Sequence, residues 1–277
     1  MRARLNVSLA LAPLMLLIAP PLAAQLRPIE PADWAALEAS APATIAIGAL
    51  GAAGQRAALA GSRGTLLEIG IVHAALRTGR VLLEIEAGAV RVLDEDTVLE
   101  PPAAYTRASD GRRRVDAGDI VVSTLIALTP LDRAATAALR FGTRLPTSDN
   151  TAGLERDQTD FFVTFGGRAR RDRLRLAAEL GLAILGTRDP LYEQADMVTY
   201  AGGARLQTSL ASPFVALVGQ WNPSDSVRPR GIHNLAELRA GLVVGHRRFL
   251  EVTAARGLTA LSPGVALRIS AGVRVGG

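Results

Sequence analysis

The chain has 277 residues, of which 49% are hydrophobic and 4% aromatic, so it is too apolar to be disordered and forms one large domain or two small ones. Cysteine is absent, which excludes disulfides and thiolate metal sites. All 31 basic residues are arginine, and the net charge is +5. Because these arginines are scattered among 26 acidic residues and form no basic face, we expect no nucleic-acid partner.

The first 24 residues predict an export signal that is cleaved before Gln25. Two positive charges in residues 1–4 precede an apolar stretch at 9–18, and small residues follow at 22–24. The apolar stretch is too short to cross ~30 Å of hydrocarbon as a helix, which argues against a membrane anchor. No apolar run of the length of a membrane helix follows it, which excludes a multispan helical protein.

Residues 25–42 differ from the rest of the chain. The stretch Pro31–Glu38 predicts a short helix that begins at a proline or aspartate. We consider two interpretations of this segment, a periplasmic lead-in or a plug that enters the lumen of a barrel.

Residues 43–277 alternate between apolar and polar residues with a period of two. In residues 173–185, aliphatic residues alternate with a second set that includes Arg173, Arg175 and Glu179. A helix would spread these charges over all its sides, whereas a strand places them on one face. The pattern predicts strands near 43–51, 64–76, 80–93, 118–128, 134–145, 159–168, 172–185, 196–206, 213–221, 235–245, 249–257 and 264–276.

The lengths of these segments and of their connections indicate a membrane barrel. Many segments run to about ten residues or more, which a tilted strand needs to cross a bilayer, while strands of soluble sandwiches have about 5–6. Short turns at 77–79, 130–133, 170–171 and 246–248 alternate with long links at 52–63, 94–117, 146–158, 186–195 and 222–234. This is typical of bacterial outer-membrane barrels. We therefore predict an all-β, antiparallel, up-and-down transmembrane barrel of about twelve strands in the outer membrane. A soluble periplasmic β-protein is the alternative.

One stretch resembles a known family. Residues 140–149 read Arg-Phe-Gly-Thr-Arg-Leu-Pro-Thr-Ser-Asp, and residues 153–161 read Gly-Leu-Glu-Arg-Asp-Gln-Thr-Asp-Phe. The stretch resembles the outer-membrane transporters of the phenol-degradation meta pathway, although Ser148 stands where that family usually has glycine. The resemblance implies a barrel and the uptake of small, hydrophobic or aromatic molecules. The matching positions are Leu145, Pro146, Thr147, Asp149, Asp157, Asp160 and Phe161.

The alternative to transport is a structural or interaction barrel that acts through its extracellular loops. The largest predicted link, 94–117, carries Pro101-Pro102 and the triplet Arg112–Arg114, which suits lipopolysaccharide or a partner. In either case the expected partners include outer-membrane lipid and lipopolysaccharide.

Neither an enzyme nor a metal site is predicted. His73 shares its parity with Ile69 and Ile71, which assigns it to the lipid face; His246 lies at a strand end and His233 in a long link. No serine on the predicted lumen face has a histidine to activate it, and an enzyme that uses only Glu84 and Glu86 is the least favoured alternative. The acidic stretches 94–96 and 149–160 lack the spacing of a calcium loop, so we expect no metal and no cofactor.

The polar face of the strands is the predicted lumen wall. It carries acidic and basic residues in similar number, so the lumen is nearly neutral and lacks the single-sign ring of a selective ion pore. We expect a salt-bridged interior that fills the barrel, and a narrow or gated passage beside these residues is the alternative. The residues assigned to the lumen are Glu68, Glu84, Glu86, Asp119, Glu179, Glu237 and Glu251, with Arg140, Arg144, Arg173, Arg175, Arg205, Arg239, Arg268 and Arg274.

Aromatic residues are few, but four of them suit the rims of a barrel. Phe161, Tyr200 and Trp221 are expected at the outer rim, and Phe249 is expected at the inner rim.

Overall fold

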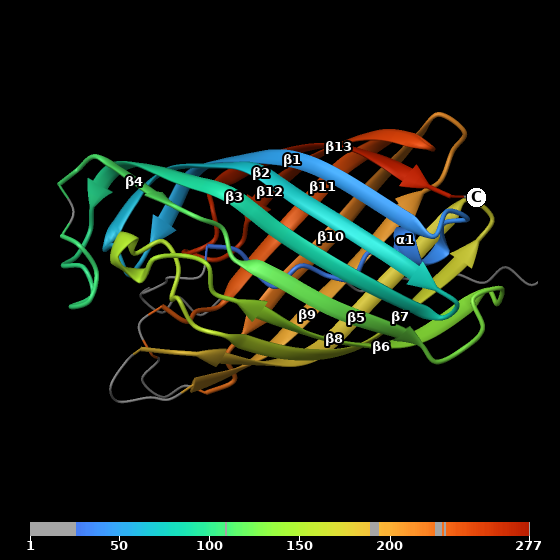
Figure 1. Cartoon of the computed structure of the whole chain (residues 1–277), viewed down its shortest axis with the longest axis horizontal. Coiled ribbons are helices and arrows are strands. Elements are labelled where there is room, and N and C mark those ends of the chain that lie inside the picture. The colour runs from blue at the N-terminus through green and yellow to red at the C-terminus, as the bar shows by residue number, and fades with distance from the viewer. Residues whose placement is uncertain (1–25, 109, 189–193, 225–228, 230, 277) are drawn as a thin grey trace, which may run out of the picture.

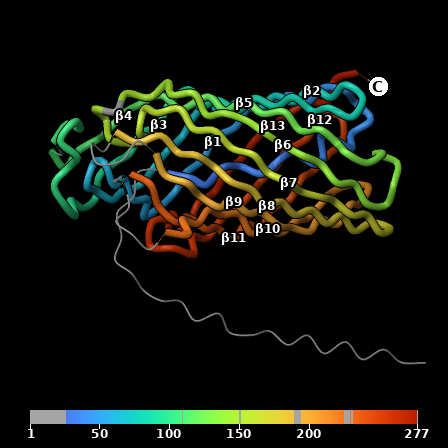
Figure 2. The backbone as a smooth tube through the Cα atoms, turned by 90° about the horizontal axis from the view of Figure 1, so that it is seen from below, coloured from blue at the N-terminus to red at the C-terminus, as the bar shows by residue number. Residues whose placement is uncertain are grey.

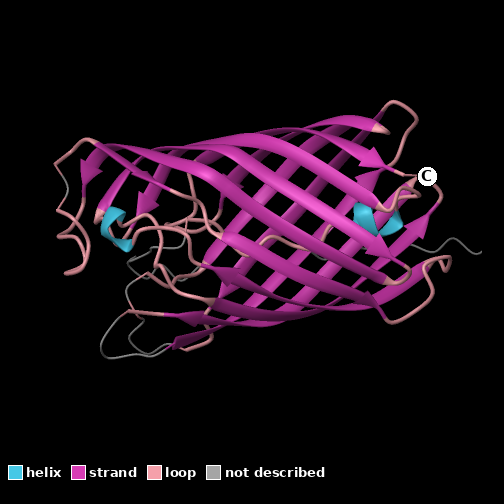
Figure 3. Ribbon diagram, in the orientation of Figure 1, coloured by secondary structure: helices cyan, strands magenta, loops and turns pink. Residues whose placement is uncertain are grey.

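The structure is a computed structural model that describes residues 26–108, 110–188, 194–224, 229 and 231–276; the predicted export signal lies outside them. Its strands form one antiparallel sheet (Figures 1 and 3). Their bounds are β1 Ala43–Ala57, β2 Ser62–Thr78, β3 Val81–Val98, β4 Arg113–Asp116, β5 Ile120–Ala127, β6 Ala135–Leu145, β7 Asp160–Arg171, β8 Leu174–Gly186, β9 Gln194–Leu206, β10 Ala211–Trp221, β11 Leu235–Gly245, β12 Arg248–Gly257 and β13 Val265–Val275. Two short helices accompany them, α1 Trp34–Glu38 and the 3-10 helix η1 Asn150–Ala152.

The sheet closes on itself. Consecutive strands pair from β5 to β13, β13 pairs with β1, and the ladder continues through β2 and β3 back to β5. The short strand β4 pairs with residues 91–94 of β3, along the same edge that pairs with β5 at 81–87. The result is a closed antiparallel barrel of twelve strands with one extra strand, which confirms the predicted fold class.

All twelve predicted strands are present, and the differences lie at the ends of β1 to β3. These strands have 15, 17 and 18 residues and extend well past the predicted boundaries. The predicted long link at 52–63 is therefore wrong, because β1 continues to Ala57 and β2 begins at Ser62. Residues 51–54 read Gly-Ala-Ala-Gly and carry no polar alternation, so the strand there leaves no trace in the pattern. The extra strand β4 has four residues, too few for a period of two to stand out.

The barrel has two different ends. At one end, called the turn end below, short connections join β2 to β3, β5 to β6, β7 to β8, β9 to β10 and β11 to β12, and the chain ends there (right in Figure 1). At the other end, called the loop end, the connections 99–112, 146–159 and 222–234 are longer, whereas 58–61, 187–193 and 258–264 are no longer than the longest connection of the turn end, 128–134. The predicted long links at 146–158 and 222–234 are confirmed, and the predicted link at 94–117 contains the extra strand β4, whereas the link predicted at 186–195 is shorter than expected.

The outer surface is apolar on strands all round the barrel. Ile47 is 58% exposed, Leu180 63% and Val215 54%, and these side chains share their face with other large aliphatic residues on the neighbouring strands. Soluble proteins rarely expose contiguous apolar patches of more than a few hundred Å². An apolar outer band is what a lipid-facing barrel presents. No helix among the described residues has the length and apolar character needed to cross a membrane.

Candidate functional site

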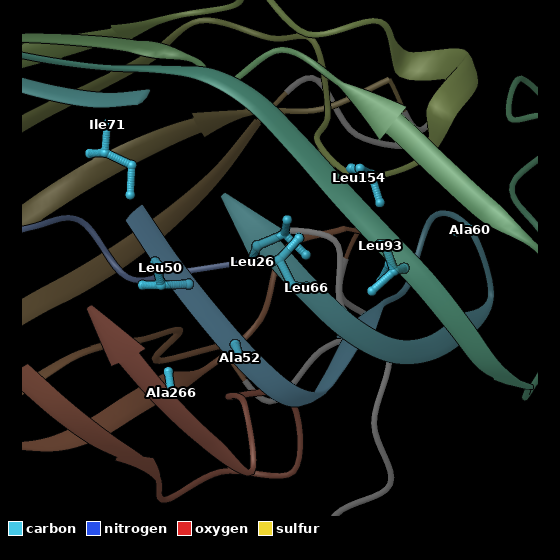
Figure 4. Close-up of a cluster of buried hydrophobic side chains, with 10 residues drawn as sticks. Leu26, Leu50, Ala52, Ala60, Leu66, Ile71, Leu93, Leu154 and Ala266 are labelled. Atoms are coloured by element: carbon cyan, nitrogen blue, oxygen red, sulfur yellow. The ribbon is translucent and has the colours of Figure 1, made fainter. Parts of the chain in front are cut away.

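The lumen is occupied by the chain segment that precedes β1. This segment, residues 26–42, is called the plug below; it runs from near the loop end to α1 at the turn end and then enters β1 (Figures 1 and 2). Leu26, at its start, is fully buried among Leu50, Leu66, Leu93 and other apolar side chains (Figure 4). The described part of this segment therefore lies inside the barrel, in contact with its wall.

Helix α1 covers residues Trp34–Glu38 of the predicted stretch Pro31–Glu38 and begins directly after an aspartate, as predicted. Asp33 is its N-cap, and its Oδ1 accepts a hydrogen bond of 2.9 Å from the Ala36 backbone nitrogen. Ala36 and Leu37 face the barrel wall and are buried against Leu82 and other apolar residues of β2, β3, β5 and β6. The helix thus lies on one side of the lumen and leaves the opposite wall free.

Two glutamates of the wall accept hydrogen bonds from the plug. Glu179 Oε1 accepts from the Ala32 backbone nitrogen (2.9 Å) and from the Trp34 indole nitrogen (2.8 Å). Glu84 Oε1 accepts from the Asp33 backbone nitrogen (2.8 Å). The two backbone donors, at Ala32 and Asp33, precede α1 and have no strand partner, so the wall carboxylates accept the hydrogen bonds that a β-ladder would otherwise accept.

Arginines of the wall bind the plug as well. Arg140 Nη1 donates to the Glu30 carbonyl oxygen (2.7 Å), and the Arg140 side chain also lies 3.5 Å from Glu84 and 4.0 Å from Glu179. The Glu30 carboxylate pairs with Arg239, with Nη2 at 3.0 Å from Oε1. Buried charges of this kind need partners, because an unpaired one costs several kcal/mol. The plug and the wall thus neutralise each other.

Further ion pairs lie at the two ends of the plug. Arg27, near the loop end, pairs with Glu30 and lies 3.4 Å from Glu68. Glu38, in α1, pairs with Arg168 and lies 3.7 Å from Arg175 Nε.

Most residues assigned to the lumen by parity line one common cavity. Arg173 does not: it was expected to face inward, but β8 begins only at Leu174, so Arg173 lies in the exposed turn after β7. The assigned residues that line the cavity are Glu68, Glu84, Glu86, Asp119, Glu179, Glu237 and Glu251, with Arg140, Arg144, Arg175, Arg205, Arg239, Arg268 and Arg274.

The assignment of His73 to the lipid face is wrong. Gly70 has a φ of +69° and is left without a partner in the ladder, where Gly48 pairs with Ile71 and Ala49 with Ile69. This β-bulge adds one residue to β2, so the parity of the strand reverses beyond it. Ile71 is therefore buried, and His73 faces the cavity with its Nε2 at 3.8 Å from Glu84 Oε1.

The bulge brings a histidine, a glutamate and a serine together, but not in the order that a hydrolase needs. Ser123 Oγ donates to Glu84 Oε2 (3.2 Å) and accepts from Arg140 Nε (3.1 Å), so its partners are the carboxylate and the guanidinium. A catalytic serine instead donates to a histidine that acts as its base. The chemistry of this group is that of an ion-pair network that binds the plug.

Phe249 is also placed differently from the prediction. It was expected at the inner rim among the lipid-facing aromatics, but it lines the cavity, with the Arg274 guanidinium 4.6 Å from its ring centroid. Phe161 and Trp221, at the loop end, are 58% and 47% exposed on the outside of the barrel.

The family-like stretch builds the connection between β6 and β7. Leu145 ends β6 with 41% of its surface exposed, and the backbone nitrogen of Thr147 donates to Asp119 Oδ1 (3.3 Å). The Asp149 carboxylate accepts from the backbone and hydroxyl of Thr151 (2.9 and 2.7 Å).

The second half of this stretch is a set of ion pairs. Asp157 pairs with Arg188, and the fully buried Asp160 begins β7 and accepts from Arg156 Nη2 (2.6 Å) and from the Gly186 backbone nitrogen (3.1 Å). These contacts shape a loop, and none of the four charged residues lines the cavity.

Glu155 lies in the same connection and is buried. Its Oε1 is 2.8 Å from Arg91 Nη1, and it borders the loop-end part of the cavity. Burial raises the pKa of Glu155 to about 7, and the attraction of Arg91 only partly opposes that rise. No pattern in the sequence points to Glu155, because it lies in a link without periodicity.

The cavity left beside the plug has a volume of about 870 Å³. Its lining includes Gln55 and Pro263 near the loop end and Arg247 and Gly276 near the turn end, so it follows the length of the barrel. On the side away from α1 it is lined by strands β9 to β13, with small residues such as Ala204 on the wall. The arrangement is that of a narrow passage between the plug and one wall.

The barrel resembles solved structures of outer-membrane proteins. An outer membrane channel from Pseudomonas putida F1 has a TM-score of 0.63 with 12% identity, over 88% of this chain and 99% of that chain. The translocator domain of the autotransporter NalP from Neisseria meningitidis has a TM-score of 0.50 with 12% identity, over 84% of this chain and 88% of that one.

By sequence, no known protein family and no curated protein matches the chain. The structural likeness thus shows the fold of an outer-membrane barrel. The sequence comparisons do not support the resemblance to the phenol-pathway transporters.

Proposed function

We propose that this chain is an outer-membrane channel for small molecules whose passage is narrowed and gated by the plug. The observation that carries the proposal is the cavity of about 870 Å³ that follows the barrel from one end to the other beside the plug. A barrel with a structural role alone has no need for a continuous internal space. The fold, which is shared with an outer membrane channel, supports the same function.

In this proposal, residues 1–24 are a cleaved export signal and the barrel inserts with its turn end toward the periplasm. Short turns face the periplasm and longer loops face outside in bacterial outer-membrane barrels. The plug then leaves the lumen on the periplasmic side, where residue 42 precedes β1.

The solutes proposed are small molecules with apolar parts, including aromatic ones. The passage runs along a wall of small side chains, among them Ala177, Gly202, Ala204 and Ala216. Charges that line it beside the plug are largely paired with each other, as Arg268 with Glu86 (2.9 Å) and Arg239 with Glu237 (2.8 Å). A solute therefore meets mostly neutral surface there.

The plug is suited to reversible movement. It adds no strand to the sheet. Besides the apolar contacts of Leu26 and of α1, it is joined to the wall through hydrogen bonds and ion pairs of its own side chains and backbone. A hydrogen bond to a charged group contributes roughly 1.5–3 kcal/mol. Because the strands of the barrel pair without the plug, the hydrogen bonds between plug and wall can be replaced by hydrogen bonds to water while the barrel stays folded.

The test is ion conductance in planar lipid bilayers with the folded full chain. Glu179→Ala removes the acceptor of two plug hydrogen bonds, so we expect more frequent or larger openings than in the unchanged protein. Glu251→Ala is the matched control, since Glu251 also lines the cavity but has Thr253 as its hydrogen-bond partner and touches no residue of the plug in the described contacts.

Folding of each variant is checked by migration on SDS gels before and after boiling, because a closed barrel has no free edges and resists the detergent until heated. If the chain is folded by this criterion and neither it nor Glu179→Ala conducts or takes up small solutes in liposomes, the channel proposal is wrong. The barrel would then act through its loops.

A further inference from the structure

Four arginines that line the turn end of the cavity have no ion pair among the described residues, namely Arg170, Arg205, Arg247 and Arg274, and two of them, Arg205 and Arg274, lie over a phenylalanine ring. Arg205 of β9 and Arg274 of β13 both line the cavity, and no carboxylate oxygen among the described residues lies within 4.0 Å of either guanidinium. Arg274 Nη1 donates to the His246 carbonyl. Asp33 and Glu251 act on Arg274 at longer range, and so does Arg205. The two side chains therefore place unneutralised positive charge on one part of the passage.

Each of these arginines lies over a phenylalanine ring. The Arg205 guanidinium carbon is 5.2 Å from the ring centroid of Phe214, which is its register partner on β10. The Arg274 carbon is 4.6 Å from the ring centroid of Phe249. A ring within about 6 Å attracts the cation and fixes its plane. Arg175, the register partner of Arg205 on β8, is by contrast near Glu38 (3.7 Å).

Glycines on the neighbouring strands make room for both rings. A Cβ on Gly241 of β11 would lie 2.5 Å from Phe214 Cζ, and a Cβ on Gly272 of β13 would lie 2.4 Å from Phe249 Cζ. Each ring therefore lies across a glycine of the wall, and any larger residue there would push it away. The two Arg–Phe pairs are held in place by the barrel itself.

The geometry points to a binding site for small carboxylates with an apolar body, a specificity that rests on the proposed channel function. A guanidinium that stacks on a ring keeps its N–H donors at the edge of its plane, where they match the two oxygens of a carboxylate. The Phe214 and Phe249 rings, with Val243 and Ala204 beside them in the cavity lining, offer apolar surface for the rest of the molecule.

The charge of the surrounding turns favours the same class of ligand. The turns 77–80, 129–134, 170–173 and 246–248 contain eight arginines and two aspartates. Positive potential around an opening raises the local concentration of anions. Carboxylates are thus drawn to the end of the barrel at which Arg205 and Arg274 lie.

The test is direct binding of 4-fluorobenzoate to the folded full chain in detergent, followed by fluorine NMR. We expect saturable binding that weakens about tenfold or more in Arg205→Gln and in Arg274→Gln, since each change removes charged donors to the ligand. Arg133→Gln is the matched control: Arg133 has the same charge but lies exposed in the turn between β5 and β6, outside the cavity lining. It removes one of the eight turn arginines and no donor of the cavity, so it should weaken binding far less than either lumen variant does.

Two more comparisons sharpen the result. Phe214→Leu keeps an apolar side chain but removes the ring under Arg205, so it should weaken binding by less than Arg205→Gln does. The neutral 4-fluorobenzyl alcohol should bind at least about tenfold more weakly than the acid. If Arg205→Gln does not fold, Arg205→Lys replaces it, because lysine keeps the charge and lacks the planar fork.

The proposal is overturned if 4-fluorobenzoate does not bind, if the alcohol binds as well as the acid, or if Arg133→Gln weakens binding as much as the lumen variants. Conductance measurements test the proposed channel function separately from the binding of the acid. A chain that conducts and does not bind the acid is a channel without this site, and one that binds the acid and never conducts has the site without the channel.

Discussion

The Trp34 indole nitrogen lies 2.8 Å from Glu179 Oε1, and this contact joins α1 of the plug to strand β8 of the wall. Trp34→Phe keeps an aromatic ring at the position and removes the donor. A hydrogen bond to a charged group contributes roughly 1.5–3 kcal/mol. Because the Ala32 nitrogen still donates to the same oxygen, we expect the loss of free energy to lie in the lower part of this range. That loss corresponds to a rise of about tenfold in the fraction of time that the channel is open in bilayer recordings.

The control for this change is Trp221→Phe. Trp221 is 47% exposed on the outside of the barrel at the end of β10, so its loss should leave the open fraction as it was. Equal open fractions in Trp34→Phe and in the unchanged protein would show that this contact does not restrain the plug.

Displacement of the plug is also open to a chemical test, because the chain has no cysteine of its own. Ala36→Cys places a single thiol on α1, where Ala36 is only 4% exposed. We expect slow reaction of the folded barrel with a maleimide, and faster reaction when Glu179→Ala is added. Ser40→Cys, at an exposed position just after α1, should react fast in both backgrounds. The same slow rate at position 36 with and without Glu179→Ala would contradict a plug that moves as a unit.

The period-two pattern of the sequence predicts the strands of the barrel but not the contacts of the plug. Alternation in β8, where Arg175 and Glu179 face inward and Leu180 outward, is a local property that one strand shows by itself. The contacts of Trp34 with Glu179 join residues that are 145 positions apart, and nothing in either neighbourhood indicates its partner. The sequence could suggest a helix near Pro31–Glu38 and a plug as one of two interpretations, and could go no further.

The predicted positions of His73 and Phe249 are wrong for two different reasons. His73 was assigned to the wrong face because parity was counted through Gly70, and a bulge adds one residue that the count cannot see. A glycine within a strand pattern is the one available signal for such a bulge. Phe249 was assigned to a rim because aromatics favour rims in general, whereas its place inside depends on Gly272 of another strand.

Gly70 is the residue on which the inward position of His73 depends. Gly70→Ala should destabilise the barrel for two reasons: its φ of +69° costs an L-residue about 1–2 kcal/mol, and the new Cβ would lie 2.8 Å from Ala89 Cβ. The expected result is a lower temperature at which the folded band is lost on SDS gels.

Gly79→Ala separates these two effects. Gly79 has a similar φ of +57°, but a Cβ there meets nothing within 4 Å, so only the backbone cost remains. We expect its midpoint to fall less than that of Gly70→Ala. Equal losses would mean that the contact with Ala89 is relieved at no cost.

The last prediction concerns pH and the loop-end carboxyl of Glu155, whose pKa is raised by burial to about 7 in the folded chain. In the unfolded chain a glutamate titrates near 4.3. Between these values the folded state holds a proton that the unfolded state has lost, so the contribution of Glu155 to stability is complete below pH ~4.3 and is lost as the pH rises through about 7. The free energy of unfolding should therefore fall with rising pH in this window, by at most about 1.4 kcal/mol per unit from this group.

Glu155→Gln isolates this contribution, because the amide mimics the protonated carboxyl and cannot titrate. Unfolding by urea in detergent, measured at several values from pH 5 to pH 8, should show that Glu155→Gln gains stability relative to the unchanged chain as the pH rises. Asp149→Asn is the control: Asp149 lies in the same connection, but hydrogen bonds from Thr151 lower its pKa, so it stays ionised throughout this range. The stability difference between Asp149→Asn and the unchanged chain should therefore be constant with pH. A constant difference for Glu155→Gln as well would mean that Glu155 is already ionised at pH 5, and that Arg91, 2.8 Å away, outweighs its burial.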